Sequence, residues 1–335
     1  MAETADTVMG LNRANLRRWA PLIVLIGLCI VVGSFNSNFF TAGNFVRLVS
    51  SAAIPVVLCM GATFIILMGS IDLSVEGVVA MAAVFSSLLV TNSVSGLEYG
   101  LWVACSVALV LGGVMGLING LLHIHLKIPS FMTTLGIGFV GLGIATATLG
   151  GLTVRIRDQD FRYLSLGRPV DFPPGKALDV PMMAWIALGA FIVAWIIQER
   201  TRFGRWIYAI GTDEITARNA GIPIERTRIL AFTIAGVFAA VGGILAAAQF
   251  GQGHALIGQG RLFTTITAVI VGGTALSGGV GSVVNSVIGV FIVVVLTNGM
   301  VLMGIEPYLQ QGVQGLMIIA AVALALDRSS LTVVK

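Results

Sequence analysis

The chain has 335 residues, of which 57% are apolar and only 10% are charged. A water-soluble domain carries about 25% charged residues, so this composition excludes an ordinary soluble protein. The net charge of +4 is a by-product of the basic residues that orient a membrane protein, and it does not indicate nucleic-acid binding.

Apolar stretches long enough to cross a bilayer recur along the whole chain. About 20 apolar residues span the hydrocarbon layer, and a charge at the centre of a span costs about 3 kcal/mol. This rule predicts an all-α polytopic membrane protein with about ten transmembrane helices and no charge at the centre of any of them. The predicted spans are Trp19–Phe35, Val46–Gly69, Ser74–Asn92, Leu101–His123, Ile128–Gly150, Pro181–Gln198, Thr227–Gln249, Leu262–Leu276, Ser282–Met303 and Leu309–Leu326.

Basic residues between the spans indicate the orientation. Arg13, Arg17 and Arg18 precede the first span, which places the N-terminus in the cytoplasm because positive charges stay inside. Ten spans return the C-terminus to the same side, where the arginine-rich stretch 199–228 also falls. The predicted division is a cytoplasmic tail (1–18), one transmembrane domain (19–326) with a cytoplasmic loop (199–228) and a periplasmic loop (151–180), and a second cytoplasmic tail (327–335).

The turn between the second and third spans is polar. Asp72 and Glu76 are four residues apart, a spacing that places two side chains on one face of a helix. Two interpretations remain open. The pair is either a polar cluster at the inner mouth of a pore, or Asp72 caps the third span while Glu76 is solvated at the membrane interface.

Two segments of the chain are similar to each other. Ile65–Ser74 aligns without gaps with Ala268–Ser277, and after a three-residue insertion Thr91-Asn92 aligns with Thr297-Asn298. Six spans separate the copies, so both would cross the membrane in the same direction, as in transporters built from parallel repeats. Chance similarity between glycine- and serine-rich turns is the alternative.

A short helix is predicted in the cytoplasmic loop. Its signals are a threonine cap, two acids in the first turn, an arginine in the last turn, and a following glycine and proline. These residues are Thr212, Asp213, Glu214, Arg218, Gly221 and Pro223. A helix of about eight residues, Asp213 to Ala220, is about 12 Å long and too short to cross the membrane. It is either an inert connector or a docking element for a cytoplasmic partner.

Four motifs together resemble the permease subunits of ribose-type ABC sugar importers. They are spread over nearly the whole chain after about residue 45. The motifs are Gly204–Gly211 with Ala217-Arg218 and Gly221-Ile222, Gly69–Val75, Ile128–Phe131 with Thr134–Gly136, and Gly272-Gly273-Thr274 with Gly278-Gly279. The chain departs from the family pattern at Thr212-Asp213, where Gly-Asn is usual, and at Leu262, where an acid is usual.

The resemblance implies a bacterial inner-membrane protein that binds no cofactor or metal and has no catalytic residue. It further implies a pore made of two permease copies, two ATP-binding-cassette subunits that carry ATP and Mg²⁺, and a periplasmic protein that delivers a monosaccharide. The helix that enters the ATPase cleft would contain Asp213, Glu214, Ala217, Arg218 and Gly221.

A pore for neutral sugars needs groups that pair with hydroxyls, and an aromatic ring. The candidates are Asp72, Ser74, Asn119, Ser130, Phe131, Thr134, Asn285 and Asn298, with Gln249, Gln252 and His254 nearer the outer mouth. The outer loop offers Phe161, Arg162 and Tyr163 either as a docking surface for the binding protein or as ordinary loop packing. Glycines that form structural turns are expected at Gly69, Gly272, Gly273, Gly278 and Gly279.

Other functions remain as alternatives. Gly175-Lys176-Ala177 lacks the hydroxyl and upstream glycine of a phosphate-binding loop, so ATP hydrolysis is expected on another chain. A secondary transporter would bury charges within the membrane, and no predicted span does so. The nearest rival is a permease of similar architecture for branched-chain amino acids or nucleosides.

Overall fold

The computed structural model describes residues 13–94, 97–169 and 179–325, and these residues are mostly helical. Each predicted span contains one apolar helix. These helices are α1 (Arg13–Phe35), α2 (Ala42–Leu67), α3 (Val75–Leu89), α4 (Gly100–His125), α5 (Ser130–Leu149), α7 (Met182–Arg200), α10 (Ile224–Phe250), α11 (Arg261–Val271), α12 (Val283–Leu302) and α13 (Pro307–Ala325). The short elements are η1 (Ser37–Phe40), β1 (Val154–Arg155), α6 (Gln159–Leu166), α8 (Arg202–Thr212), α9 (Glu214–Asn219), β2 (Gln252–Gly253) and η2 (Ala255–Gly258).

Six of these helices, α2, α4, α5, α7, α10 and α12, are long and apolar enough to cross a membrane. The apolar part of α1, the helix α3 and the segment Ala255–Val271 are apolar but shorter. The expectation of an all-α polytopic membrane protein therefore agrees with the fold. Most of the predicted tails, and residues 170–178 of the predicted outer loop, lie outside the described residues.

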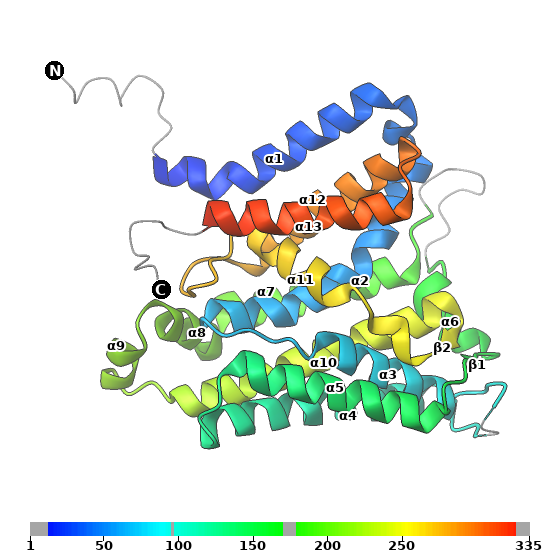
Figure 1. The fold of residues 1–335 in the computed structure, drawn as a ribbon, viewed down its shortest axis with the longest axis horizontal. Coiled ribbons are helices and arrows are strands. Elements are labelled where there is room, and N and C mark those ends of the chain that lie inside the picture. Colours follow the sequence, from blue (N-terminus) through cyan, green and yellow to red (C-terminus); the bar gives the residue numbers. More distant parts are fainter. Residues whose placement is uncertain (1–12, 95–96, 170–178, 326–335) are drawn as a thin grey trace.

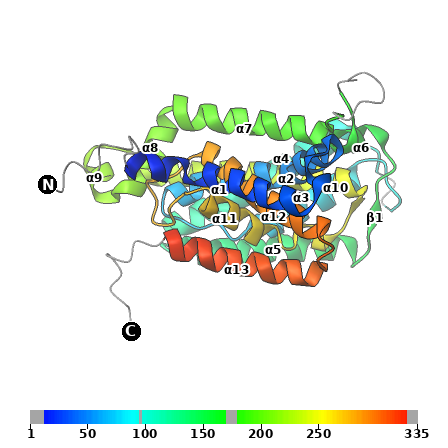
Figure 2. The same ribbon diagram turned by 90° about the horizontal axis from the view of Figure 1, so that it is seen from above.

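The long helices run roughly along the longest axis of the molecule (Figure 1). The start of α1, the end of α13 and both α8 and α9 lie at one end, while α6, β1 and β2 lie at the other. Seen from above, α7 lies on one side of the bundle and α13 on the opposite side (Figure 2). The two strands pair antiparallel through Val154 with Gly253 and Arg155 with Gln252.

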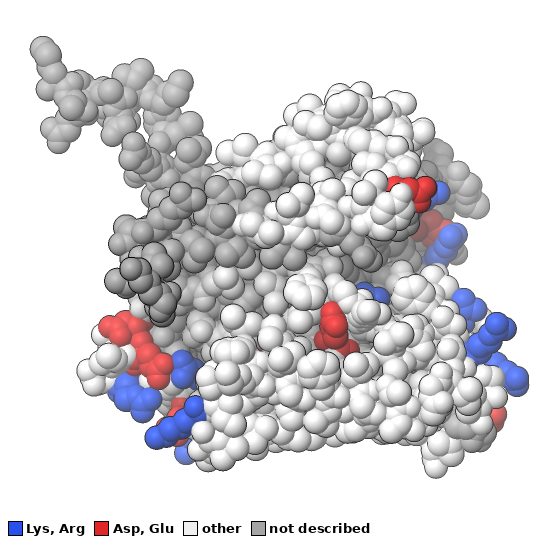
Figure 3. Space-filling view, viewed as in Figure 1, with Lys and Arg blue, Asp and Glu red and all other residues white. Residues whose placement is uncertain are grey.

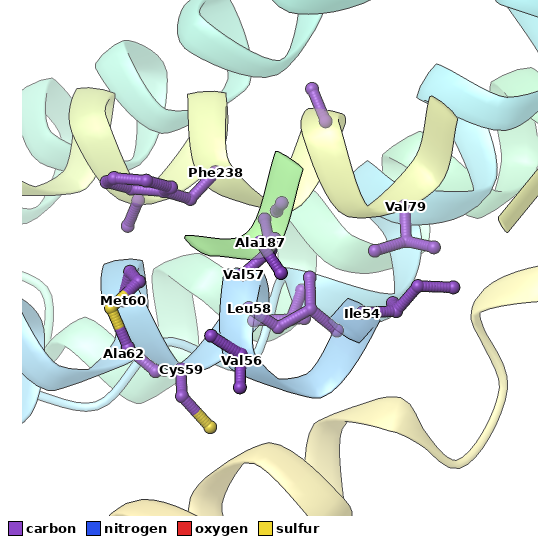
Figure 4. Close-up of a cluster of buried hydrophobic side chains, with 14 of the residues drawn as sticks. Ile54, Val56, Val57, Leu58, Cys59, Met60, Ala62, Val79, Ala187 and Phe238 are labelled. Atoms are coloured by element: carbon purple, nitrogen blue, oxygen red, sulfur yellow. The ribbon is translucent and has the colours of Figure 1, made fainter. Parts of the chain in front are cut away.

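Helix α2 lies at the centre of the bundle, and 78% of its most apolar window is buried. Its side chains pack among residues from α3, α7 and α10, including Val79, Ala187 and Phe238 (Figure 4). Between α4 and α10 a glycine permits close approach, because a Cβ on Gly112 would lie 2.5 Å from the carbonyl oxygen of Gly236. Such contacts matter in lipid, where packing and not the hydrophobic effect holds helices together.

Helices α3 and α11 begin within the bundle. They have 15 and 11 residues, about 22 and 17 Å at 1.5 Å per residue, against roughly 30 Å of hydrocarbon. Figure 1 shows α3 starting near the middle of the long axis. Glu76 lies in the first turn of α3 and Arg261 is the first residue of α11, so each charge lies at the start of its helix and not at its centre. Asp72 precedes α3, so the predicted shared helix face with Glu76 does not exist.

The turns after α2 and α11 have the same hydrogen-bonding pattern. Ser70 N donates to the Ile65 carbonyl over 3.1 Å, and Thr274 N donates to the Val269 carbonyl over 3.2 Å. The matching glycines, Gly69 and Gly273, have φ of 69° and 93°, a backbone region that suits glycine. Gly69 thus matches Gly273 in conformation, one residue away from the sequence alignment.

Candidate functional site

Helix α8 lies against the C-terminal end of α2 through its apolar face. Thr201 caps it by accepting a hydrogen bond from Gly204 N over 3.2 Å. Phe203, Ile207 and Ile210 are buried, and the Phe203 ring meets Phe64 of α2 edge-on with 6.0 Å between ring centres. The helix is therefore fixed to the core, and only its polar face is open.

Helix α9 is capped by Asp213. Its Oδ1 accepts hydrogen bonds from Ile215 N at 2.9 Å and Thr216 N at 3.2 Å, and its Oδ2 accepts one from the Thr216 hydroxyl at 2.5 Å. These hydrogen bonds, led by that of the hydroxyl, hold the pKa of the Asp213 carboxyl below its usual value. The predicted Thr212 cap is wrong, because Thr212 ends α8 and its hydroxyl donates to the Tyr208 carbonyl.

The short helix is otherwise close to the prediction. It has six residues instead of eight, and Gly221 follows it with φ 77°, the left-handed conformation expected of a glycine cap. Ala217 is buried and faces the protein. Ile215 is 74% exposed. Sequence reasoning missed Ile215, although one isoleucine among polar residues outside any span is a readable signal.

Glu214 joins α9 to the start of α10. Its Oε2 lies 2.7 Å from Arg228 Nη2, and its Oε1 lies 3.4 Å from Arg218 Nη2. The Arg228 side chain is 17% exposed and that of Arg218 is 60% exposed. Arg228 is thus the stronger brace of α9, a role that its place among the arginines of the loop 199–228 does not predict.

Helix α8 also contacts the end of α2 and the glycine turn at Gly278 and Gly279. Gly279 N donates to the Leu67 carbonyl over 2.9 Å, and a Cβ on Gly211 would collide with that carbonyl oxygen and lie 2.5 Å from Gly279 N. Gly278 and Gly279, where a turn is expected, have φ of 87° and 75°. Movement of α8 would therefore press directly on the ends of α2 and of the loop before α12.

A second link runs through Tyr208. Its hydroxyl donates to the Gly281 carbonyl over 2.6 Å and accepts from Gln198 Nε2 over 2.8 Å. Gln198 Oε1 in turn accepts from Val283 N over 2.7 Å. Burial, together with the charge of Glu199, raises the pKa of Tyr208 to about 12, so the hydroxyl keeps its proton as donor at neutral pH. This chain of hydrogen bonds joins α7, α8 and α12.

Five of the predicted pore residues gather around the extended segment before α3. Ile71 N donates to Ser130 Oγ at 3.1 Å and Leu73 N to Thr134 Oγ1 at 2.9 Å, both on the first turns of α5. Two further hydrogen bonds run from Ser74 Oγ to Asp72 Oδ1 at 2.6 Å and from Asn119 Nδ2 to Ser74 Oγ at 3.0 Å. These hydrogen bonds fix the position of the extended segment between α2 and α3.

The other predicted residues lie elsewhere. Asn298 exchanges two hydrogen bonds with Asn44, at 2.9 and 3.1 Å, near the C-terminal end of α12. Asn285 lies in the first turn of that helix, and Phe131 is 44% exposed on α5. Of the predicted docking residues Phe161 is fully buried, so that assignment is wrong for its ring, and Tyr163 is 47% exposed.

Two adjoining cavities open between the ends of the bundle. One of about 390 Å³ is lined by Phe250, His254, Leu256, Ile257, Gln259, Gly260, Arg261 and Thr264. One of about 210 Å³ is lined by Leu73, Glu76, Gly77, Leu135, Gly138, Phe139, Leu142, Ala255, Leu256, Gln259 and Leu262. Figure 3 shows most charges at the two ends of this face and, between them, an acidic patch in a hollow with a basic patch beside it.

Comparison with known proteins agrees with these features. Residues 44–322 match a family described as branched-chain amino acid transport system, permease component. The ribose import permease protein RbsC of Escherichia coli (strain K12) is 31% identical, covering 95% of this chain and 98% of the relative. The probable ABC transporter permease protein YphD of the same strain is 37% identical, covering 90% and 87%. The L-arabinose transport system permease protein AraH of that strain is 32% identical, covering 91% and 89%. No solved structure matches the chain.

Proposed function

Because this chain belongs to the permease family of the branched-chain amino acid transport system and is a ribose-type ABC permease within it, we propose that it forms the membrane passage for a small sugar. The names of the relatives support the substrate class, since the ribose and L-arabinose permeases both align over nearly the whole chain. ATP is hydrolysed on a separate partner subunit, and this chain binds neither nucleotide nor metal.

The observation that carries the proposal is the construction of α8 and α9. A six-residue helix with an exposed Ile215 is capped by Asp213, braced by Arg228 and joined to α8 through the single extended residue Asp213. Helix α8 touches the end of α2 through Gly211, and it touches the loop before α12 through Gly211 and Tyr208. A force applied to α9 from outside the membrane would thus reach the interior of the bundle, as an ATP-driven importer requires.

The assembly we propose has two copies of this chain around one pore, two ATPase subunits on α9, and a periplasmic binding protein at the opposite end. Both chain ends lie in the cytoplasm, which is supported by the start of α1 and the end of α13 lying at the same end as α9 (Figure 1). All ten apolar helices belong to the membrane domain. The parallel repeat is supported by the shared turn geometry at Gly69 and Gly273.

The test is transport by the complete importer. The chain, its ATPase and its binding protein are reconstituted in proteoliposomes, and uptake of radiolabelled D-ribose, L-arabinose and L-leucine is measured with and without ATP. We expect ATP-dependent uptake of a sugar. Uptake of leucine alone would show that the substrate is an amino acid and not a sugar. Uptake driven by an ion gradient without the ATPase would overturn the importer assignment.

A further inference from the structure

The two adjoining cavities contain charged groups that the fold does not use fully. We propose that they form the subsite at which the permease holds a neutral, polyhydroxylated sugar, and that Glu76, Gln259 and Arg261 bind its hydroxyl groups. This inference rests on the proposed function and adds the residues that contact the substrate. It differs from the sequence-based choice of residues, whose hydroxyls and amides are largely occupied within the protein.

Glu76 is half used. Its Oε1 accepts hydrogen bonds from Gly260 N at 2.9 Å and Leu262 N at 3.3 Å, at the start of α11. Within the described residues its Oε2 accepts none, and the side chain lines the smaller cavity. A carboxylate oxygen between the ends of a membrane bundle needs a donor, and a sugar hydroxyl in the cavity supplies one.

Arg261 lines the larger cavity, and only part of its guanidinium donates a hydrogen bond within the described residues. Its Nε donates to the Ile257 carbonyl over 3.1 Å, which leaves the terminal nitrogens of the guanidinium. None of the ion pairs among the described residues joins Arg261 to Glu76. An acid and a base on adjoining cavities would ordinarily pair. Kept apart, they can bind different hydroxyls of one ligand, since a hydroxyl both donates and accepts.

Gln259 and Phe139 complete the subsite. Gln259 lines both cavities, and its exposed side chain makes no hydrogen bond within the part of the chain that the structure describes. Phe139, on α5, lines the smaller cavity and is 65% exposed. A site with one apolar surface and a few converging polar groups is typical of small-ligand binding, and the ring offers the C–H face of a sugar a flat partner.

The experiment separates binding in the cavity from a structural role of Glu76. In Glu76→Gln the side-chain oxygen still accepts from Gly260 N and Leu262 N, while the free acceptor becomes a donor. Gln259→Ala removes a side chain that bonds to nothing else in the described residues. Glu98→Gln is the matched control, because Glu98 is an exposed carboxylate outside both cavities. All three are assayed in the complete reconstituted importer.

The readout is the uptake of D-ribose or L-arabinose, whichever the wild type transports, divided by ATP hydrolysed. We expect Glu76→Gln and Gln259→Ala to lower this ratio at least about tenfold, as loss of a hydrogen bond to a charged or polar group does, with Glu98→Gln close to wild type. Unchanged ratios in both variants would overturn the subsite, as would a parallel loss of uptake and ATP hydrolysis. Absence of sugar uptake by the wild type would instead overturn the proposed function.

Discussion

The backbone amide of Gly279 donates to the carbonyl of Leu67 over 2.9 Å, which ties the loop before α12 to the end of α2. Gly211 of α8 lies against this bond with no room for a Cβ. Three segments that are far apart in the sequence thus meet at one backbone contact, beside the last residues of α8. The contact gives a physical route from the surface of the protein to its interior.

Gly211→Ala is expected to destabilise the protein because its methyl group would collide with the Leu67 carbonyl oxygen. Overpacking of this kind costs about 1–3 kcal/mol, so the melting temperature in detergent should fall. Gly189→Ala, in helix α7, is the matched control, since a Cβ there meets nothing within 4 Å. An equal melting temperature for the two variants would contradict the tight contact.

Arg228→Ala should weaken coupling more than Arg218→Ala. Arg228 is 2.7 Å from Glu214 and mostly buried, whereas the Arg218 pair is 3.4 Å and exposed. An exposed pair within a helix contributes about 0.3–0.5 kcal/mol, and loss of a partly buried charged hydrogen bond costs about 1–3 kcal/mol. The measurement is uptake per ATP hydrolysed. A larger effect of Arg218→Ala would show that Arg228 does not brace α9.

Replacing Glu214 and Arg218 together is expected to uncouple ATP hydrolysis from transport while the chain stays in the membrane, because Glu214 contacts both arginines. Membrane fractionation checks the location, and the uptake assay checks coupling. Unchanged uptake by this double variant would remove α9 from the coupling route.

Ile215→Asp is expected to prevent docking of the ATPase subunit. Ile215 is 74% exposed, so the substitution costs the fold little, but it would place a charge in an apolar contact with the partner. Co-purification of the ATPase with the permease is the measurement, and Ile215→Leu is the control that keeps an apolar side chain. Normal recovery of the ATPase with Ile215→Asp would show that Ile215 is not part of the interface.

Acid should loosen the start of α9. Hydrogen bonds to Asp213 hold the pKa of its carboxyl below the unfolded value of about 3.9. The stability from this cap is therefore fully present above about pH 4 and is lost as pH falls through the folded pKa. Hydrogen exchange of residues 213–219, corrected for the intrinsic rate, should accelerate at low pH in the wild type. Asp213→Asn retains a cap that does not titrate, and its exchange should not show this acceleration.

The Asn44 and Asn298 amides should be coupled. They exchange two hydrogen bonds across α2 and α12, so each single change to alanine leaves the other amide without its partner. Hydrogen bonds between membrane helices contribute about 0.6 kcal/mol on average and up to about 1.7. A double-mutant cycle on thermal stability should give a coupling energy in this range. Additive effects would mean that the amides do not act as a pair.

Local sequence information was sufficient for the long helices and for the short helix α9. Hydropathy averaged over a window reports whether a segment avoids water, and every predicted span contains a helix. The acids, arginine and glycine around α9 act within one or two turns of the chain, so their roles could be predicted. The choice of Thr212 over Asp213 as cap failed because α8 continues through Thr212, which depends on what α8 packs against.

The sequence by itself determined that this chain is a helical membrane protein of the sugar-permease kind, because composition and family motifs are properties of the chain alone. Tertiary structure decided where along the bundle α3 and α11 begin and which polar side chains are left without a hydrogen-bond partner within the described residues. Glu76 meets Gly260, 184 positions later, and such a partner turns an interior charge from a cost into a contact. Hydropathy could not reveal this, since it assigns each residue an energy without regard to the amides that the fold brings beside it.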